Sequence, residues 1–192
     1  MISAVKYSST TISCAASVEQ PRWFAVYTHP RHEKAVSDQL EKRGVEAFLP
    51  TFTSESQWKD RRVKITQPLF PGYVFARIRM EEKIRVVSSP SVIRIVSFNG
   101  MPAAISEREI ESVRLCSERG ALLEVCPFLE VGERVRVRAG AFEGVEGFVV
   151  NRKNGCKLVI SIGVIHQSVA IEINAEQLER LSSVGYDNGS IQ

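Results

Sequence analysis

The sequence predicts an α+β protein of two domains, in which a split βαβ domain precedes a small all-β barrel. Three observations carry this prediction. Apart from the strand expected over Arg61–Thr66, residues 22–98 alternate between strand and helix patterns in the order β-α-β-β-α-β, which is the split βαβ plan. A helix-start signal at Ser106 then predicts one extra helix. From Val131 onward, short alternating strands are separated by glycines, as is typical of a small barrel.

The elements of the first domain follow from hydrophobic periodicity and from the prolines and glycines between them. In order, the sequence predicts a strand over Trp23–Thr28, a helix over Arg31–Arg43 that ends at Gly44, a strand over Val45–Phe52, a loop over Thr53–Asp60, strands over Arg61–Thr66 and Tyr73–Ile78, a short helix over Glu81–Ser88 with Ile84 and Val87 facing inward, and a strand over Val92–Phe98 that turns at Asn99-Gly100.

The stretch Pro68–Ile78 is the most distinctive in the chain. Two prolines fix φ and remove backbone donors, and a strand rich in β-formers follows them. Because side chains alternate along a strand, Val74, Ala76 and Ile78 point to one face and are expected in the core. Tyr73 and Phe75 point to the other face, where packing of the core gives no obvious need for aromatic side chains.

The extra helix has a complete start signal. Ser106 and Glu109 form a capping box, flanked by Ile105 and Ile110 as a hydrophobic staple, and the helix is expected to run to about Arg119.

The strands of the second domain are joined by tight turns, and Asn154-Gly155 is expected to form one of them. The sequence thus divides into a disordered tail at 1–20, a first domain at 21–119, a linker at 120–130, a barrel at 131–181 and a tail at 182–192.

The composition and charge of the chain limit the classes of function that it can have. The chain has 192 residues, 44% hydrophobic and 24% charged, as in a soluble globular protein. Residues 22–120 hold 17 Lys/Arg against 12 Asp/Glu, whereas residues 121–192 hold 7 against 9. This imbalance indicates two domains with different partners, and it is too small to predict strong sequence-independent binding of nucleic acid.

The four cysteines form no C-x-x-C pair and have no metal-ligand spacing with the three histidines, so we expect free thiols in a reducing cytoplasm. The stretch before Cys14 is polar, which argues against a signal peptide, and no run of residues predicts a membrane span. No nucleophile–base pair, phosphate-binding glycine loop or metal cluster indicates an enzyme. We therefore expect no catalytic residues, no metal and no cofactor.

Two separated motifs resemble one family. Trp23-Phe24-Ala25-Val26-Tyr27 and Pro68-Leu69-Phe70-Pro71-Gly72-Tyr73-Val74-Phe75 resemble the N-terminal domain of NusG-type transcription elongation factors, and Gly132–Val137 with Ala141–Gly147 resemble their KOW domain. The resemblance covers about residues 21–181. It implies a ferredoxin-like first domain with an extra helix, followed by an SH3-like barrel. Gln57–Arg61 resembles the specialised paralogues that act as antiterminators of long operons.

The resemblance implies that the first domain binds the clamp helices of the large RNA polymerase subunit through a hydrophobic pocket. The matching positions are Tyr27, Phe70, Tyr73, Phe75 and Ile93. Aromatic side chains on a rigid strand are typical binding anchors, which agrees with this role. The alternative is that Tyr73 and Phe75 lie in the core under the extra helix.

Two further contacts are implied by the resemblance. His29, Arg31, His32 and Arg43 match the side that contacts the non-template DNA strand, the alternative being a solvated helix face. Phe142 matches the KOW loop that meets a small-subunit ribosomal protein or the termination factor Rho, the alternative being a cap on the barrel. Residues 163–169 depart from the family's usual sequence at this point, which bears on both of these partners.

The predicted function is therefore that of a monomeric bacterial elongation and antitermination factor that suppresses pausing or termination and has no membrane partner. The alternative is an RRM-like RNA-binding module, because the strand order and Gly72–Phe75 also fit an RRM strand that stacks bases. An RRM would place a basic residue and glycines where this chain has Phe70-Pro71, which favours the first interpretation.

Overall fold

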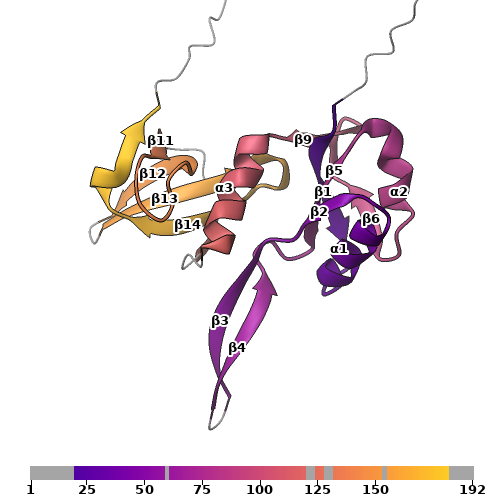
Figure 1. Cartoon of the computed structure of the whole chain (residues 1–192), viewed down its shortest axis with the longest axis horizontal. Helices are drawn as coiled ribbons and strands as arrows, with labels where there is room; N and C mark the ends of the chain where they lie inside the picture. Colours follow the sequence, from indigo (N-terminus) through magenta and orange to yellow (C-terminus); the bar gives the residue numbers. More distant parts are fainter. Residues whose placement is uncertain (1–19, 59–60, 120–123, 128–131, 153–154, 182–192) are drawn as a thin grey trace, which may run out of the picture.

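The computed structural model describes residues 20–58, 61–119, 124–127, 132–152 and 155–181 (Figure 1). The predicted tails, apart from residue 20, lie outside the described residues, as do most of the predicted linker and Asn154 of the predicted turn. The first domain contains β1 (Arg22–Thr28), α1 (Glu33–Lys42), β2 (Glu46–Phe48), β3 (Thr51–Trp58), β4 (Arg61–Pro68), β5 (Tyr73–Ile78), η1 (Met80–Glu82), α2 (Lys83–Val87), β6 (Val92–Ile95), β7 (Ser97–Phe98), β8 (Met101–Pro102), β9 (Ala104–Ile105) and α3 (Glu107–Glu118).

The first-domain sheet has the order β2-β5-β1-β6, with β9 pairing to β1. Every pairing is antiparallel, and β5 lies between β1 and β2. Because β1 and β2 are joined through α1 and both run antiparallel to the strand between them, the predicted split βαβ plan is confirmed.

Helices α1 and α2 cover one face of this sheet (Figure 1). That face holds the predicted aliphatic side of β5, and Val74, Ala76 and Ile78 are all buried there. Val36 and Leu40, four residues apart on α1, pack into the same cluster. Gly44 follows the helix with φ of 74°, as predicted for its stop signal.

The predicted loop over 53–60 is wrong, because residues 51–58 form β3 and pair with β4 along their whole length. Pro50 separates β3 from β2, so the single strand predicted over Val45–Phe52 is divided in two. Strands β3 and β4 form a two-stranded sheet of their own, which projects away from the body (Figure 1). The polar Thr and Ser residues concealed this strand from a search for apolar alternation.

The inward orientation predicted for Ile84 and Val87 is also wrong. Their exposed fractions are 73% and 40%, and Val86 is the buried residue of α2. The helix is only five residues long and follows the 3₁₀ turn η1, so its phase is set by that turn rather than by its apolar spacing. By contrast, Asn99 and Gly100 both have positive φ between β7 and β8, as the predicted hairpin requires.

The second domain is all-β, as predicted. It contains β10 (Glu124–Pro127), β11 (Glu133–Val137), β12 (Glu146–Arg152), β13 (Gly155–Ile162), η2 (Gly163–Ile165), β14 (Gln167–Ile173), η3 (Ala175–Gln177) and β15 (Leu178–Arg180). The sheet order is β10-β14-β13-β12-β11-β15, with all pairings antiparallel. Strand β10 lies within the predicted linker, so part of that segment belongs to the barrel sheet.

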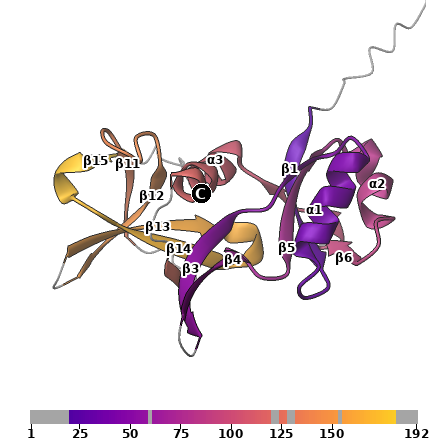
Figure 2. The ribbon, with the colours of Figure 1, turned by 60° about the horizontal axis from the view of Figure 1, so that its bottom comes forward.

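Helix α3 lies between the two domains (Figures 1 and 2). It contacts β1 on one side and β12 and β13 on the other. The second face of the first-domain sheet and the interior of the barrel consequently form one continuous cluster of buried apolar residues, which includes Ile110, Val113 and Cys116 of α3.

Candidate functional site

The turn before β5 is held by one side chain and one backbone group from other elements. Glu33 accepts a hydrogen bond from the Gly72 backbone N–H at 2.8 Å, and the backbone N–H of Thr28 donates to the Gly72 carbonyl at 2.9 Å. Glu33 is buried, although it is a carboxylate in the first turn of α1. Gly72 has φ of 84°, a conformation that disfavours other residues. The turn therefore fixes where β5 begins and where Tyr73 points.

Six aromatic side chains gather on the sheet face opposite α1 and α2, and we call them the aromatic face: Trp23, Tyr27, Phe48, Phe70, Tyr73 and Phe75. The ring centroids of Tyr27 and Tyr73 lie 5.3 Å apart, and those of Phe70 and Phe75 lie 5.9 Å apart at an interplanar angle of 88°. Such edge-to-face and tilted contacts stabilise aromatic clusters beyond area burial.

The structure brings four of the five predicted polymerase-contact residues together, at different depths. Phe70 and Phe75 are buried, at 1% and 0% exposure, whereas Tyr27 and Tyr73 are partly buried. Ile93 lies on β6 as the unpaired residue of a bulge opposite Tyr27 and Thr28, and it is 45% exposed. Arg94, next along β6, places its guanidinium 5.8 Å from the Tyr27 ring centroid. Among the four predicted contact residues on the aromatic face, the two tyrosines are therefore the accessible ones.

The predicted nucleic-acid contacts lie in two places. His29, Arg31 and His32 share the exposed connection between β1 and α1, where Arg31 has φ of 65°. Arg43 follows the other end of α1, roughly 15 Å away at 1.5 Å per helical residue. Its guanidinium donates to the Arg85 carbonyl at 3.0 Å and to the Ser88 hydroxyl at 2.9 Å. Arg43 thus binds the end of α2.

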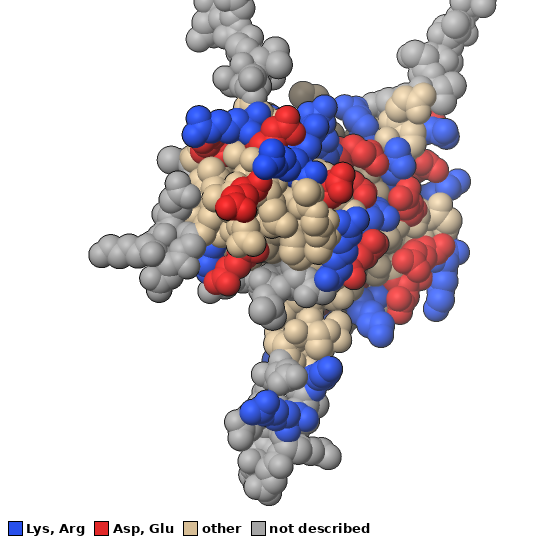
Figure 3. All heavy atoms as spheres, turned by 60° about the vertical axis from the view of Figure 1, so that its left-hand side comes forward, with Lys and Arg blue, Asp and Glu red and all other residues tan. Residues whose placement is uncertain are grey.

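Charged side chains are interspersed over the body of the face drawn in Figure 3. Lys and Arg side chains lie along the projecting hairpin in the same view, where Arg62 and Lys64 are exposed. The side chains of Gln57–Arg61, which carry the resemblance to antiterminators, lie outside the described residues.

Phe142 is only partly exposed. It lies in the loop between β11 and β12 and packs against the cluster shared by the two domains. The backbone of this loop is fixed by Gly144, whose N–H donates to the Val137 carbonyl at 2.9 Å. Phe142 therefore both caps apolar residues and presents part of its surface.

Helix α3 has one side bound to the first domain. Glu107 accepts a hydrogen bond from the Trp23 indole at 3.3 Å, and the Ser117 hydroxyl donates to the Thr51 carbonyl at 2.8 Å. The Arg114 guanidinium lies 4.9 Å from the Phe48 ring centroid, a cation–π arrangement. These contacts cover the Trp23 and Phe48 end of the aromatic face.

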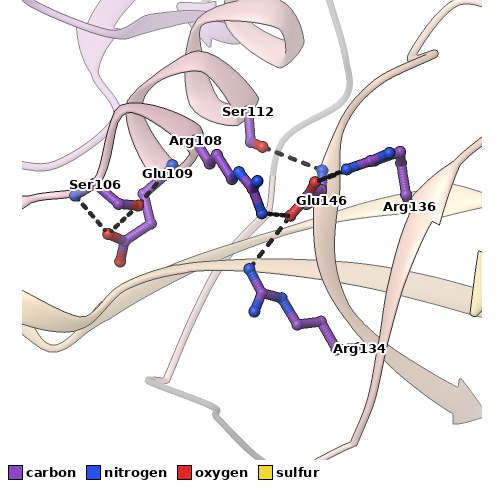
Figure 4. Close-up of polar contacts among 7 residues, drawn as sticks. All are labelled: Ser106, Arg108, Glu109, Ser112, Arg134, Arg136 and Glu146. Atoms are coloured by element: carbon purple, nitrogen blue, oxygen red, sulfur yellow. Dashed lines mark hydrogen bonds and ion pairs between the residues drawn. The ribbon is translucent and has the colours of Figure 1, made fainter. Parts of the chain in front are cut away.

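The other side of α3 is bound to the barrel through Glu146 (Figure 4). The Glu146 backbone N–H donates to the Ser112 hydroxyl at 3.1 Å, and its carboxylate lies 3.8 Å from the Arg108 guanidinium. Arg134 and Arg136 contact the same carboxylate from β11, at 3.2 Å and 3.0 Å. We call these five residues the Glu146 contact. A cavity of about 290 Å³ lies beside it, between the start of α3 and the strands β12 and β13.

The charge state of Glu146 follows from its surroundings. Its side chain is 9% exposed. Burial raises the pKa of this carboxyl, but the hydrogen bond from Arg136 and the charges of Arg136, Arg108 and Arg134 outweigh burial and hold the pKa below its usual value. Glu146 is therefore ionised at neutral pH and attracts guanidinium groups from both domains.

Sequence reasoning missed Glu33, Ser112 and Glu146. Glu33 lies in the first turn of α1, where the helix dipole already favours an acidic residue, so its identity gave no sign of a bond to Gly72. Ser112 and Glu146 are 34 residues apart and meet only when the domains pack together. The alternation Arg134-Val135-Arg136, which sets two cations on one side of a strand, was the one signal for a buried acid nearby.

In the described part of the chain, no group of three or more His, Cys, Asp or Glu side chains is placed to hold a metal ion. Cys116, Cys126 and Cys156 are in no disulfide, and Cys14 lies outside the described residues. No helix among the described residues is long and apolar enough to cross a membrane.

Comparison with known proteins points to a single family. Residues 21–114 match the family model described as "Transcription termination factor nusG". A "Transcription termination/antitermination protein NusG" of Staphylococcus aureus is 30% identical over 175 residues, covering 83% of this chain and 96% of the relative. The protein of the same description from Lactococcus lactis is 25% identical over 175 residues, covering 84% and 94%.

A solved structure titled "Domain interaction in Thermotoga maritima NusG" is similar at 22% identity and a TM-score of 0.48, covering 84% of this chain and 98% of that chain.

Proposed function

Because the chain belongs to the NusG family, we propose that it is a transcription elongation and antitermination factor that binds RNA polymerase through the aromatic face. The observation that carries this proposal is the Tyr27–Tyr73 pair. Both rings are partly exposed, and both lie on adjacent strands at the edge of a buried aromatic cluster. Rigid aromatic side chains bind a partner at little cost in conformational entropy.

The partner surface is the pair of clamp helices of the large polymerase subunit. Helices present ridges of apolar side chains, and exposed aromatic rings offer an apolar surface against which such ridges can pack. By binding one conformation of the polymerase more tightly than another, the protein shifts its population toward that conformation. Stabilising the closed clamp in this way suppresses pausing and premature termination.

Other contacts extend this function. The exposed connection that holds His29, Arg31 and His32 supplies donors for the non-template DNA strand. The exposed part of Phe142 is available to a barrel partner, Rho or a small-subunit ribosomal protein. The protein acts as a monomer in the cytoplasm, in the role of a specialised paralogue.

The test is capture of purified bacterial RNA polymerase by the full chain, followed by transcription on a template with a strong pause. Tyr73→Ala is expected to weaken polymerase binding at least about tenfold, since an anchor residue contributes about 2 kcal/mol or more. Phe98→Ala is the matched control, because Phe98 is an aromatic residue at 52% exposure on β7. If folded Tyr73→Ala binds polymerase as tightly as the Phe98→Ala control does, the aromatic face is not the binding site.

A further inference from the structure

Three side chains form one row across three strands of the first-domain sheet. Tyr73 of β5 is paired with Tyr27 of β1, and Tyr27 is paired with Arg94 of β6. Directly opposed residues share a face of a sheet, and Ile95, the next residue of β6, packs on the side that α1 and α2 cover. Arg94 therefore lies on the same face as the two tyrosines, and we call these three residues the tyrosine–arginine row.

The members of the tyrosine–arginine row contact one another in order. The ring centroids of Tyr73 and Tyr27 are 5.3 Å apart, and the Arg94 guanidinium lies 5.8 Å from the Tyr27 ring centroid. Ile93 is the extra residue of the β6 bulge, and it is exposed like Arg94 beside it. A partner that covers the Tyr27 ring must therefore also remove water from the Arg94 guanidinium.

Arg94 differs in its ion pairing from Arg114, which also lies over an aromatic ring of this face. The Arg114 guanidinium is 4.9 Å from the Phe48 ring centroid and pairs with Glu46 at 3.9 Å. Among the residues that the structure describes, no carboxylate pairs with Arg94, whose contact is with the Tyr27 ring. The chain thus neutralises the cation at one end of the aromatic face and leaves the cation at the other end to a partner.

The surroundings of Arg94 favour a protein carboxylate as that partner. A guanidinium that loses its water without gaining an ionic partner weakens an interface, whereas a carboxylate binds it through two parallel hydrogen bonds. Binding to nucleic acid depends on several cations that each contact a phosphate, and the row holds one cation beside two tyrosines. Tyrosine and arginine together are typical of the centres of protein–protein interfaces.

We propose that Arg94 determines the specificity of the polymerase-binding site by pairing with an Asp or Glu of the partner helix. On a helix, residues three or four positions apart have Cβ atoms about 5–6 Å apart. This spacing matches the 5.8 Å between the Arg94 guanidinium and the Tyr27 ring. The acidic residue is therefore one turn from the apolar side chain that packs on the tyrosines. The inference rests on the proposed function for the identity of the partner.

The first test is the affinity of the full chain for purified core RNA polymerase that carries no nucleic acid. Arg94→Met retains a long apolar side chain without charge, and Arg94→Glu reverses the charge. Arg79→Glu is the matched control, at an exposed arginine that follows the far end of β5. We expect binding about tenfold weaker or more for Arg94→Glu, several-fold weaker for Arg94→Met and unchanged for the control. Added salt should weaken wild type more than Arg94→Met, because salt screens the ion pair.

The outcomes separate this inference from the proposed function. If wild type binds polymerase and folded Arg94→Glu binds as tightly as Arg79→Glu, the role of Arg94 is overturned and the proposed function stands. A loss that occurs only when the polymerase carries a nucleic-acid scaffold shows a phosphate contact and overturns the carboxylate. If wild type does not bind polymerase at all, both are overturned.

The second test identifies the partner group. Arg94→Lys places an amine in the row, and a carbodiimide joins an amine to a neighbouring carboxylate as an amide. We expect a cross-link from position 94 of Arg94→Lys to an Asp or Glu on a helix of the large polymerase subunit, and none from position 79 of Arg79→Lys. Replacing that acidic residue by Lys should restore the binding of Arg94→Glu. Failure of the cross-link or of the restored binding overturns the inference.

Discussion

The buried carboxylate of Glu33 gives a direct test of how the aromatic face is positioned. Replacing Glu33 by Ala removes the acceptor of the Gly72 N–H, which is otherwise bonded at 2.8 Å inside the protein. A hydrogen bond to a charged group contributes about 1.5–3 kcal/mol, and the buried N–H is left without a partner. We expect Glu33→Ala to lower the free energy of unfolding by about 2 kcal/mol.

Glu33→Gln separates the hydrogen bond from the charge. A glutamine carbonyl can still accept from Gly72, while the favourable interaction of the carboxylate with the start of α1, about 0.3–1 kcal/mol, is lost. The expected loss for Glu33→Gln is therefore less than half of that for Glu33→Ala. Lys34→Ala, at an exposed neighbouring position, is the control and is expected to change stability by no more than about 0.5 kcal/mol.

The assay is urea unfolding of the full chain, followed by the fluorescence of the buried Trp23. Hydrogen exchange at the Gly72 amide supplies a local measure of the same bond. If Glu33→Ala unfolds within about 0.5 kcal/mol of wild type and its Gly72 amide exchanges no faster, then Glu33 does not hold the turn.

Three further predictions follow from single groups. Gly72→Ala is expected to destabilise by about 1–2 kcal/mol because of its φ of 84°, and because its Cβ would lie 3.2 Å from Cε2 of Tyr27; an unchanged urea midpoint would contradict this. Burial raises the pKa of Cys116 to about 12, with Arg119 lowering it only in part, so alkylation at pH 8 should spare Cys116 in the folded chain; modification as fast as that of Cys126 would refute it. The pKa of Glu146 is lowered in the folded chain. The ionised carboxylate therefore stabilises the fold fully above the ordinary carboxyl pKa, and this stabilisation is lost as the pH falls through the lowered pKa of Glu146. The stability difference between wild type and Glu146→Gln should therefore shrink below about pH 4, and a difference that stays constant would count against the ion pairs.

Local signals in the sequence were sufficient for much of the fold. The alternation of β5, the stop at Gly44 and the capping box at Ser106 all depend on residues within one turn or one strand, and all were correctly predicted. The buried side of α2 was predicted incorrectly. This helix has only five residues, which are too few for their periodicity to outweigh the preceding 3₁₀ turn.

The candidate site was only partly predictable for a different reason. Tyr73 and Phe75 alternate with the core, which singled them out, but their exposures differ because Phe75 lies under elements that come later in the chain. Phe75 is core, as the alternative interpretation expected, whereas Tyr73 is partly exposed and its binding role stays a prediction. Ser112 and Glu146 act through a contact between domains, and no periodicity within either element encodes that contact.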